Sequence, residues 1–183
     1  MTTSNATTAD SETILRALRR TRQIRDFRPD PIPDDVLEKV LDVARWTGSA
    51  MNRQPWTFVV IRDRDRRAKL VELAPQAGHV AKAAAVIAIV MPGDSADQDS
   101  YDEGRVSERI LVAATALGLG AGIGWVRQAN WRGVAELLGI PSPQFVRTFI
   151  SLGYPTEAAA APKNKPGAAR KPLSELVRYE RFG

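Results

Sequence analysis

The feature that most constrains the fold is an unbroken run of apolar residues, AAVIAIVM, at positions 84–91. The run is too short to cross a bilayer as a helix, and its β-branched residues favour a strand. A strand that is apolar at every position needs cover on both of its faces. The run therefore predicts a central strand in a sheet with helices on both sides, which is an α/β or α+β arrangement.

Strand-like and helix-like segments alternate along the rest of the chain. Further strands are expected at 57–61, at 145–154 and within GLGAGIGWV at 118–126. Helices are expected at 11–20, 34–46, 65–73, 102–117 and 130–140, with a short last helix in LSELVRY. The apolar side chains expected to share a helix face are Ile14, Leu15 and Leu18, then Val36, Leu37, Val40, Leu41 and Ala44, then Val106, Ile110, Ala113 and Leu117. The length of 183 residues suits one domain, which we place at 12–183 after a disordered lead-in at 1–11.

The composition excludes several kinds of chemistry. The chain has no cysteine, so disulfides, thiolate metal sites and cysteine nucleophiles are absent. Its one histidine, His79, argues against a histidine metal site and against a Ser-His-Asp triad. A lone histidine is more often a surface or hydrogen-bonded residue than a catalyst. The first residues do not resemble a secretory signal and no segment suits a bilayer, so we expect a cytoplasmic protein with no membrane partner.

The charge is basic, with a net value of +5. One local cluster of arginines contributes strongly to it: Arg16, Arg19, Arg20, Arg22, Arg25 and Arg28. Such a cluster is either a solvated basic face or a pocket for an anionic ligand. No recognised nucleic-acid motif accompanies the charge, so no nucleic-acid partner is expected.

Two polar segments near the N-terminus carry the clearest chemical signals. In TRQIRDF, at 21–27, Arg22 and Arg25 could converge on one phosphate, because a guanidinium offers paired donors. The alternative is surface charge. In SAMNRQPW, at 49–56, the amides of Asn52 and Gln54 can both donate to and accept from the edge of a heterocycle. The alternative is a polar loop, with Trp56 in the core in either case.

Two other patterns indicate structure more than chemistry. The glycines at 118, 120, 122 and 124 do not make a dinucleotide motif, because Ile123 and Trp125 stand where its last glycine belongs. They indicate a helix end followed by backbone packed closely against something, which could be a flat ligand ring. The acidic run of Asp94, Asp97 and Asp99 lacks the remaining features of a calcium loop and is expected to be solvated.

Taken together, these segments resemble the nitroreductase family of flavoenzymes from about residue 14 to the C-terminus. TRQIRDF is similar to the family's R-R-S-x-R-x-F element, and SAMNRQPWTFVVI is similar to its S-x-x-N-x-Q-P-W/F-x-F segment. The stretch from Asp102 to Trp125 resembles the family's D-x-G-x-A helix leading to GLG, and LLGIP, ISLGYP and RKPL resemble its late segments. The resemblance implies a mostly antiparallel sheet of four to five strands flanked by helices, in a homodimer with exchanged C-terminal tails.

The resemblance also implies two FMN sites across the dimer interface. Arg22 and Arg25 would bind the phosphate, with Gln23 nearby. Ser49, Ala50, Asn52 and Gln54 would line the flavin ring, and the backbone of Ile123 and Gly124 would lie beside it. Arg170 and Lys171 would reach the phosphate or ribityl chain of a site shared with the other subunit. No metal is implied and no side chain acts as a catalyst, because the flavin carries the chemistry.

The implied activity is transfer of a hydride from NAD(P)H through FMN to an electron-poor acceptor, such as a nitroaromatic or a quinone, in a ping-pong cycle. The chain departs from the family pattern at Thr21 and Gln23, which replace an arginine and a serine, at Gly48, which replaces a proline, and in the AGIGW turn. Alternatives are therefore a flavin storage protein with little turnover, or a specialised relative that fragments flavin or removes halogen.

Overall fold

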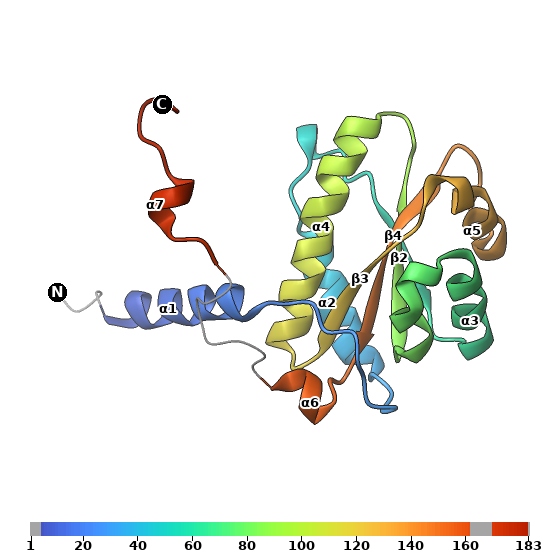
Figure 1. The fold of residues 1–183 in the computed structure, drawn as a ribbon, viewed down its shortest axis with the longest axis horizontal. Helices are drawn as coiled ribbons and strands as arrows, with labels where there is room; N and C mark the ends of the chain where they lie inside the picture. Colours follow the sequence, from blue (N-terminus) through green and yellow to red (C-terminus); the bar gives the residue numbers. More distant parts are fainter. Residues whose placement is uncertain (1–4, 162–169, 183) are drawn as a thin grey trace.

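The computed structural model describes residues 5–161 and 170–182 and is built around a four-stranded antiparallel sheet (Figure 1). The strand order is β1-β2-β4-β3. The strands are β1 (Thr57–Ile61), β2 (Ala85–Met91), β3 (Gly120–Trp125) and β4 (Phe145–Gly153). The expected antiparallel sheet flanked by helices is thus confirmed, at the lower end of the expected strand number.

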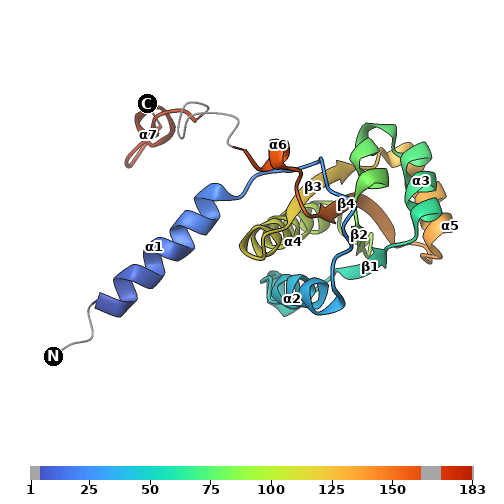
Figure 2. The same cartoon turned by 90° about the horizontal axis from the view of Figure 1, so that it is seen from below.

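Strand β2 lies inside the sheet, and every one of its residues is buried. Ile87 and Ile89 pack on one side with α2 (Asp34–Arg45) and α4 (Ala96–Ala116). Val86 and Val90 pack on the other side with α3 (Arg64–Leu73) and α5 (Trp131–Leu138). Figure 2 shows the sheet between these two helical layers. The prediction from the apolar run at 84–91, a strand covered on both faces, is confirmed.

The buried stripes expected for α2 and α4 are confirmed with one exception. Leu37, Val40 and Ala44 are buried in α2, with Val36 and Leu41 partly buried against the same core. In α4, Val106, Ile110 and Ala113 are buried. The prediction for Leu117 is wrong, because α4 ends at Ala116 and Leu117 is left 36% exposed, while Leu119 turns into the core.

The acidic run before α4 is also not fully solvated as expected. Helix α4 begins at Ala96, earlier than predicted, and this brings Asp99 to a buried position. Its carboxylate accepts a hydrogen bond of 3.0 Å from the main-chain N–H of Gly93. Asp99 therefore closes the turn between β2 and α4.

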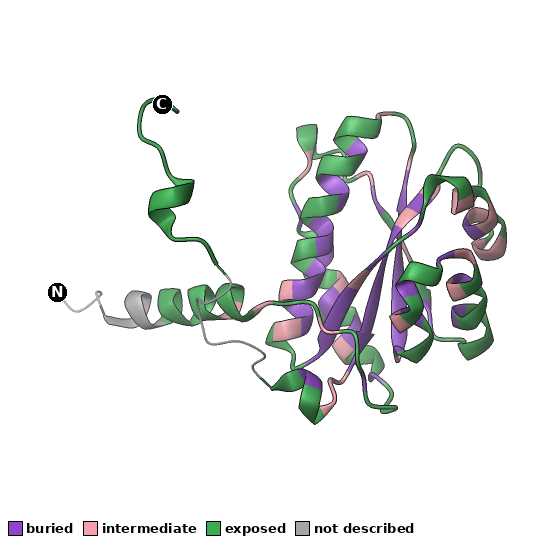
Figure 3. Ribbon diagram, viewed as in Figure 1, coloured by how far each residue is buried: buried purple, intermediate pink, exposed green. Residues whose placement is uncertain are grey.

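The two ends of the chain extend from this body. Helix α1 (Asn5–Arg20) starts before the expected Ser11, so part of the expected lead-in is helical, and it projects from the sheet layers (Figures 1 and 2). After β4 come α6 (Glu157–Ala160) and, beyond residues 162–169, α7 (Leu173–Leu176). Figure 3 shows that both arms are largely exposed, including these apolar side chains: Ile14, Leu15, Leu18, Leu173, Leu176, Tyr179 and Phe182. No helix in the described part of the chain is long and apolar enough to cross a membrane.

A buried ion pair joins α4 to β4. Glu103 is 2% exposed and accepts from Arg147 through the guanidinium Nε at 2.7 Å and through Nη2. The Arg147 guanidinium lies 5.3 Å from the ring centre of Trp125 and 5.9 Å from that of Phe145. Burial raises the pKa of Glu103 even though Arg147 acts in the opposite direction. The carboxylate is thus held in a dry position that depends on Arg147.

We predict that Arg147→Met destabilises the fold by about 3–5 kcal/mol, because it leaves the buried Glu103 without a counter-ion. The free energy of urea unfolding measures this loss. The matched control is Arg132→Met. Arg132 Nε lies 2.8 Å from Glu136 Oε1, and both side chains are mostly exposed. The loss in this control should stay below about 1 kcal/mol.

The loss in Arg147→Met should also depend on pH. Because the folded-state pKa of Glu103 lies above its ordinary value, the contribution of this group to stability is full at low pH and declines as the pH rises through the folded-state pKa. Removing Arg147 raises that pKa further, so the loss should be smaller at pH 5 than at pH 8. A loss that does not vary with pH would contradict an uncompensated Glu103 charge.

Candidate active site

The outer edge of β3 is where the predicted site residues meet. Residues 21–27 run along this edge, and the Ile24 N–H donates to the Ala121 carbonyl at 2.7 Å. One step further, side chains replace this main-chain pairing. The Ile123 N–H donates to Gln23 Oε1 at 3.2 Å, and the Ile123 carbonyl accepts from Arg25 Nη2 at 3.2 Å. Ile123 is therefore an edge residue whose two main-chain groups are satisfied by exposed side chains.

This arrangement suits ligand binding. Arg25 Nη2 also donates to Gln23 Oε1 at 2.6 Å, so the two side chains hold each other in place. Side chains on a surface can rotate away at small cost, whereas a paired strand cannot. The Ile123 N–H and carbonyl can then exchange these partners for the polar atoms of a ligand. Of the predicted residues, the structure brings together Gln23, Arg25 and Ile123, with Gly124 next in the strand.

The face of β3 toward η2 (Pro75–Lys82) has no side chains at two positions, and the space is used. A Cβ on Gly122 would lie 2.8 Å from Arg25 Cγ and 3.1 Å from Ser151 Oγ. A Cβ on Gly124 would lie 2.8 Å from Ala77 Cβ. The prediction that these glycines allow close packing is confirmed, and here the packed groups are Arg25 and η2.

Behind this edge lies His79, which the sequence analysis treated as a surface or hydrogen-bonded residue. It is half-buried in η2, and its Nδ1 is 2.8 Å from Ser151 Oγ. Ser151 is fully buried and donates to the Gly122 carbonyl at 3.1 Å. The pKa of His79 is lowered by burial and then by the charge of Arg25, whereas a hydrogen bond from the ring to the Ile123 carbonyl raises it. His79 is therefore hydrogen-bonded, neutral at pH 7, and electrostatically coupled to the site.

Gln76 is a further site residue that the sequence analysis missed. Its Nε2 donates to the Trp125 carbonyl, two residues along the edge from Ile123. Trp125 is 52% exposed, so this end of the edge is open to a ligand. No local pattern in the sequence marks Gln76, because only the packing of η2 on β3 brings the two together.

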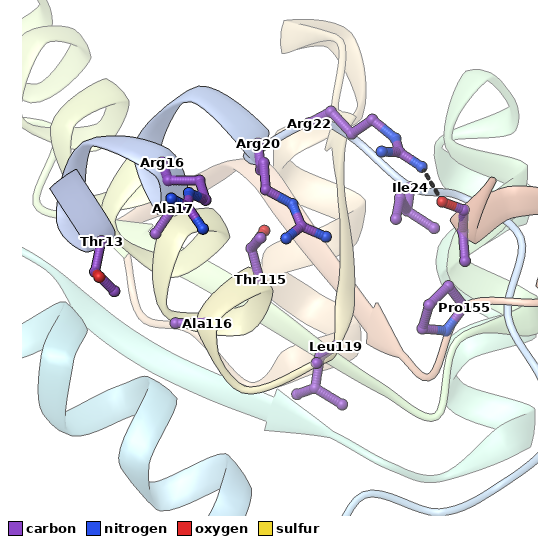
Figure 4. Close-up of a pocket in the computed structure, with 12 residues that line it drawn as sticks. Thr13, Arg16, Ala17, Arg20, Arg22, Ile24, Thr115, Ala116, Leu119 and Pro155 are labelled. Atoms are coloured by element: carbon purple, nitrogen blue, oxygen red, sulfur yellow. Dashed lines mark hydrogen bonds between the residues drawn. The ribbon is translucent and has the colours of Figure 1, made fainter. Parts of the chain in front are cut away.

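The prediction that Arg22 and Arg25 converge on one phosphate is not met in this conformation. Arg22 Nη2 donates to the carbonyls of Ala159 at 2.9 Å and Ala160 at 2.8 Å, which ties α6 to the start of the arginine segment. Arg22 instead lines a cavity of about 470 Å³ at the C-terminal end of α4, with Arg16 and Arg20 (Figure 4). The two guanidiniums point to different elements, because Arg22 donates to carbonyls of α6 and Arg25 donates to a carbonyl of β3.

The loop of the second motif forms a separate unit. The Gln54 N–H donates to Ser49 Oγ at 2.8 Å, and Asn52 and Gln54 have positive φ values of 56° and 48°. Ser49 and Ala50 line a cavity of about 380 Å³ with Tyr101 and Arg105 of α4. The Arg105 guanidinium lies against Gly48, where a Cβ would be 2.8 Å from Nη2.

Within one chain, this loop and the β3 edge do not form a single site. The loop lies against the α4 face that carries Tyr101 and Arg105. Ile123 instead shares a cavity of about 260 Å³ with Glu103, Gly104 and Ser107 of α4. Among the described residues, no hydrogen bond or ion pair connects the loop with Gln23, Arg25 or Ile123.

The remaining predicted residues lie in the C-terminal arm. Arg170 and Lys171 follow the segment at 162–169 and are exposed. They form no hydrogen bond or ion pair with the rest of the described chain.

Comparison with known proteins identifies the family. Residues 18–107 match the model described as the nitroreductase family. The chain is 34% identical over 151 residues to a protein of Methanothermobacter thermautotrophicus whose name places it among NADH dehydrogenases or NAD(P)H nitroreductases, with 79% of this chain and 78% of that protein covered. It is 25% identical over 178 residues to FMN reductase [NAD(P)H] of Bacillus subtilis, with 85% of this chain and 71% of that protein covered.

A solved structure shows the same fold. The FMN-dependent nitroreductase of Clostridium difficile R20291 superposes with a TM-score of 0.80 over 91% of this chain and 98% of that one, at 23% sequence identity. Sequence and fold agree, and this chain belongs to the nitroreductase family.

Proposed function

We propose that this protein is an FMN-dependent oxidoreductase that takes electrons from NAD(P)H and passes them to an electron-poor acceptor such as a nitroaromatic or a quinone. The observation that carries the proposal is the β3 edge, where side chains of Gln23 and Arg25 hold the main-chain groups of Ile123. The proposal is supported by relatives that are named for NAD(P)H and FMN.

The donors present at this edge fit a flavin ring. An isoalloxazine edge offers carbonyl oxygens, ring nitrogens and one N–H, so it needs both donors and acceptors in a row. The Ile123 N–H and the amide of Gln23 supply these, and the glycines at 122 and 124 let Arg25 and η2 pack close to this edge. A bound flavin supplies the two-electron chemistry, while the protein binds, orients and tunes it. The fixed charge of Arg25 stabilises negative charge that arrives beside it.

The phosphate needs a cationic anchor, and Arg25 is the predicted residue that already lies at the edge. Arg170 and Lys171 would add positive charge from the C-terminal arm of a second copy. The ring-lining residues of the loop, Ser49, Ala50, Asn52 and Gln54, would also come from the second copy, but as neutral polar and small groups. Arg22 would act indirectly, since it holds α6 and with it the start of that arm. A site assembled in this way is complete only when two copies of the chain meet.

The exposed arms support a homodimer with exchanged C-terminal tails. Ile14 in α1 is 61% exposed, and Leu176 and Phe182 near the C-terminus are 61% and 90% exposed. Isolated exposed apolar residues are ordinary, but two projecting arms that each carry several of them offer apolar surface that another chain can cover. In a twofold dimer each arm would cover the same surface of the partner.

The cycle we propose is ping-pong, with NAD(P)H and the acceptor using one site in turn. No side chain of the chain needs to serve as a nucleophile, which agrees with a chain that has no cysteine and one histidine. A cytoplasmic location and the absence of a nucleic-acid partner stay predictions.

We predict that Arg25→Ala weakens FMN binding about tenfold, or about 1.4 kcal/mol, because it removes a charge-assisted contact. Titration of the apoprotein with FMN, followed by quenching of flavin fluorescence, measures the change. Arg28→Ala is the matched control, since Arg28 lies in the same segment and pairs with Asp30 at the surface. Equal affinities for Arg25→Ala and the unmodified chain would remove Arg25 from the site.

Mixing two defective variants tests whether each site is shared. One chain carries Arg25→Ala, and the other carries Asn52→Gly, which removes the amide but tolerates the positive φ. After random subunit exchange, half of the dimers are mixed, and one of their two sites has both motifs intact. We expect roughly a quarter of the normal high-affinity sites to return. No recovery would show that both motifs act within one chain.

Redox titration separates turnover from storage. We expect the FMN-loaded protein to lose its yellow colour when NADH or NADPH is added without oxygen, and to regain it when a nitroaromatic or quinone follows. Absorbance near the flavin band measures both steps. Flavin that stays oxidised with both nucleotides would favour the storage alternative, and a protein that takes up no FMN would overturn the proposal.

A further inference from the structure

His79 is the only histidine of the chain and lies directly behind the β3 edge. The hydroxyl proton of Ser151 is donated to the Gly122 carbonyl at 3.1 Å. A hydroxyl has one proton, so while Ser151 donates to that carbonyl its Oγ can accept a hydrogen from His79 Nδ1 across their 2.8 Å contact.

The surroundings are also arranged for the charged form of this ring. Ser151 Oγ accepts from Nδ1, and the Ile123 carbonyl favours the protonated ring through a hydrogen bond. Both acceptors are fixed, because Ser151 is fully buried and Ile123 lies in a strand. A Cβ on Gly124 would lie 3.6 Å from His79 Cε1, so the glycine lets the ring lie close to the strand.

Two effects oppose the charged form, and one of them is adjustable. Burial is the larger and is fixed by the fold. The other is the charge of Arg25. Helix α3 and strands β3 and β4 pack against η2, and the segment of Arg25 lies beside them. Among the charged side chains of these elements, Arg25 is the one whose charge lowers the pKa of His79. The same Arg25 lies where the proposed ligand brings negative charge.

We propose that His79 is the proton-accepting residue of this site, neutral while no negative charge lies beside Arg25 and protonated when one does. The inference rests on the proposed function. A hydride taken from NAD(P)H carries two electrons and one proton, so its arrival adds one negative charge to the site as NAD(P)⁺ departs. His79 takes one proton from solvent, which restores the charge of the site. The proton is available again when the hydride leaves with the acceptor.

A single histidine makes this directly measurable, because its Cε1–H gives one NMR signal in the labelled full-length protein. The signal is followed from pH 5 to pH 9 in the apoprotein, with FMN bound, and after anaerobic photoreduction of the bound FMN. We expect the midpoint to lie below 6.5 in the apoprotein and to rise when FMN binds, because the phosphate then offsets the charge of Arg25. It should rise again by about one pH unit or more on reduction, as for a group that gains an opposite charge nearby. Equal midpoints before and after reduction would overturn the inference.

Variants of the apoprotein test the contacts without any flavin. Arg25→Gln should raise the His79 midpoint, because it removes the opposing charge, whereas the control Arg28→Gln should leave it unchanged. Ser151→Ala should lower the midpoint by removing the Nδ1 acceptor, and Ser151→Thr should restore it. An unchanged midpoint in Arg25→Gln would contradict the coupling.

The redox potential gives an independent readout in the FMN-loaded protein. The pH dependence of this potential gives the number of protons taken up with the two electrons. Between the pH midpoints of His79 in the oxidised and in the reduced protein, we expect two protons to be taken up, against one proton in His79→Gln. The same proton count in both proteins would show that His79 is only structural. A chain that binds no FMN defeats the proposed function, whereas a chain that binds and reduces FMN with an unshifted His79 defeats only this inference.

Discussion

The candidate site depends on one structural constraint, which is that β3 ends the sheet and loses its main-chain partner at Ile123. Up to Ala121 the strand is paired by the segment of Ile24. At Ile123 the side chains of Gln23 and Arg25 take over. An unpaired strand edge is normally covered or blocked. Here the covering groups are polar, exposed and exchangeable, so the edge that the fold leaves open is also the place where a ligand can be recognised.

The glycines of β3 make this edge usable. They leave the face toward η2 bare, and the stem of Arg25, the hydroxyl of Ser151 and the ring of His79 occupy the space. A chain of polar contacts thus runs from the buried core to the exposed Arg25. The charge at the surface changes the pKa of His79, because little water lies between the two groups to screen their interaction. Binding and protonation are coupled by this geometry.

Helix α4 divides the remaining functional residues. The serine loop lies on one of its faces and the Ile123 cavity on another, so the two motifs that resemble the family cannot meet in one chain. The exposed apolar arms give a physical reason for a second copy to be present. On this view, dimer formation and assembly of the site are the same event.

The sequence by itself determined the central strand, the alternation of strands and helices, and the two polar segments proposed for the site. These follow from local patterns, since a continuous apolar run needs cover on both faces and a loop of amides and arginines is recognisable without a fold. It could not determine that Arg22 turns to α6 while Arg25 turns to Ile123, or that Asp99 is buried and Leu117 exposed. Gln76 and His79 likewise joined the site only through packing of η2 on β3. These outcomes depend on which carbonyls, hydroxyls and apolar faces lie nearby, and only the tertiary structure brings such distant groups together.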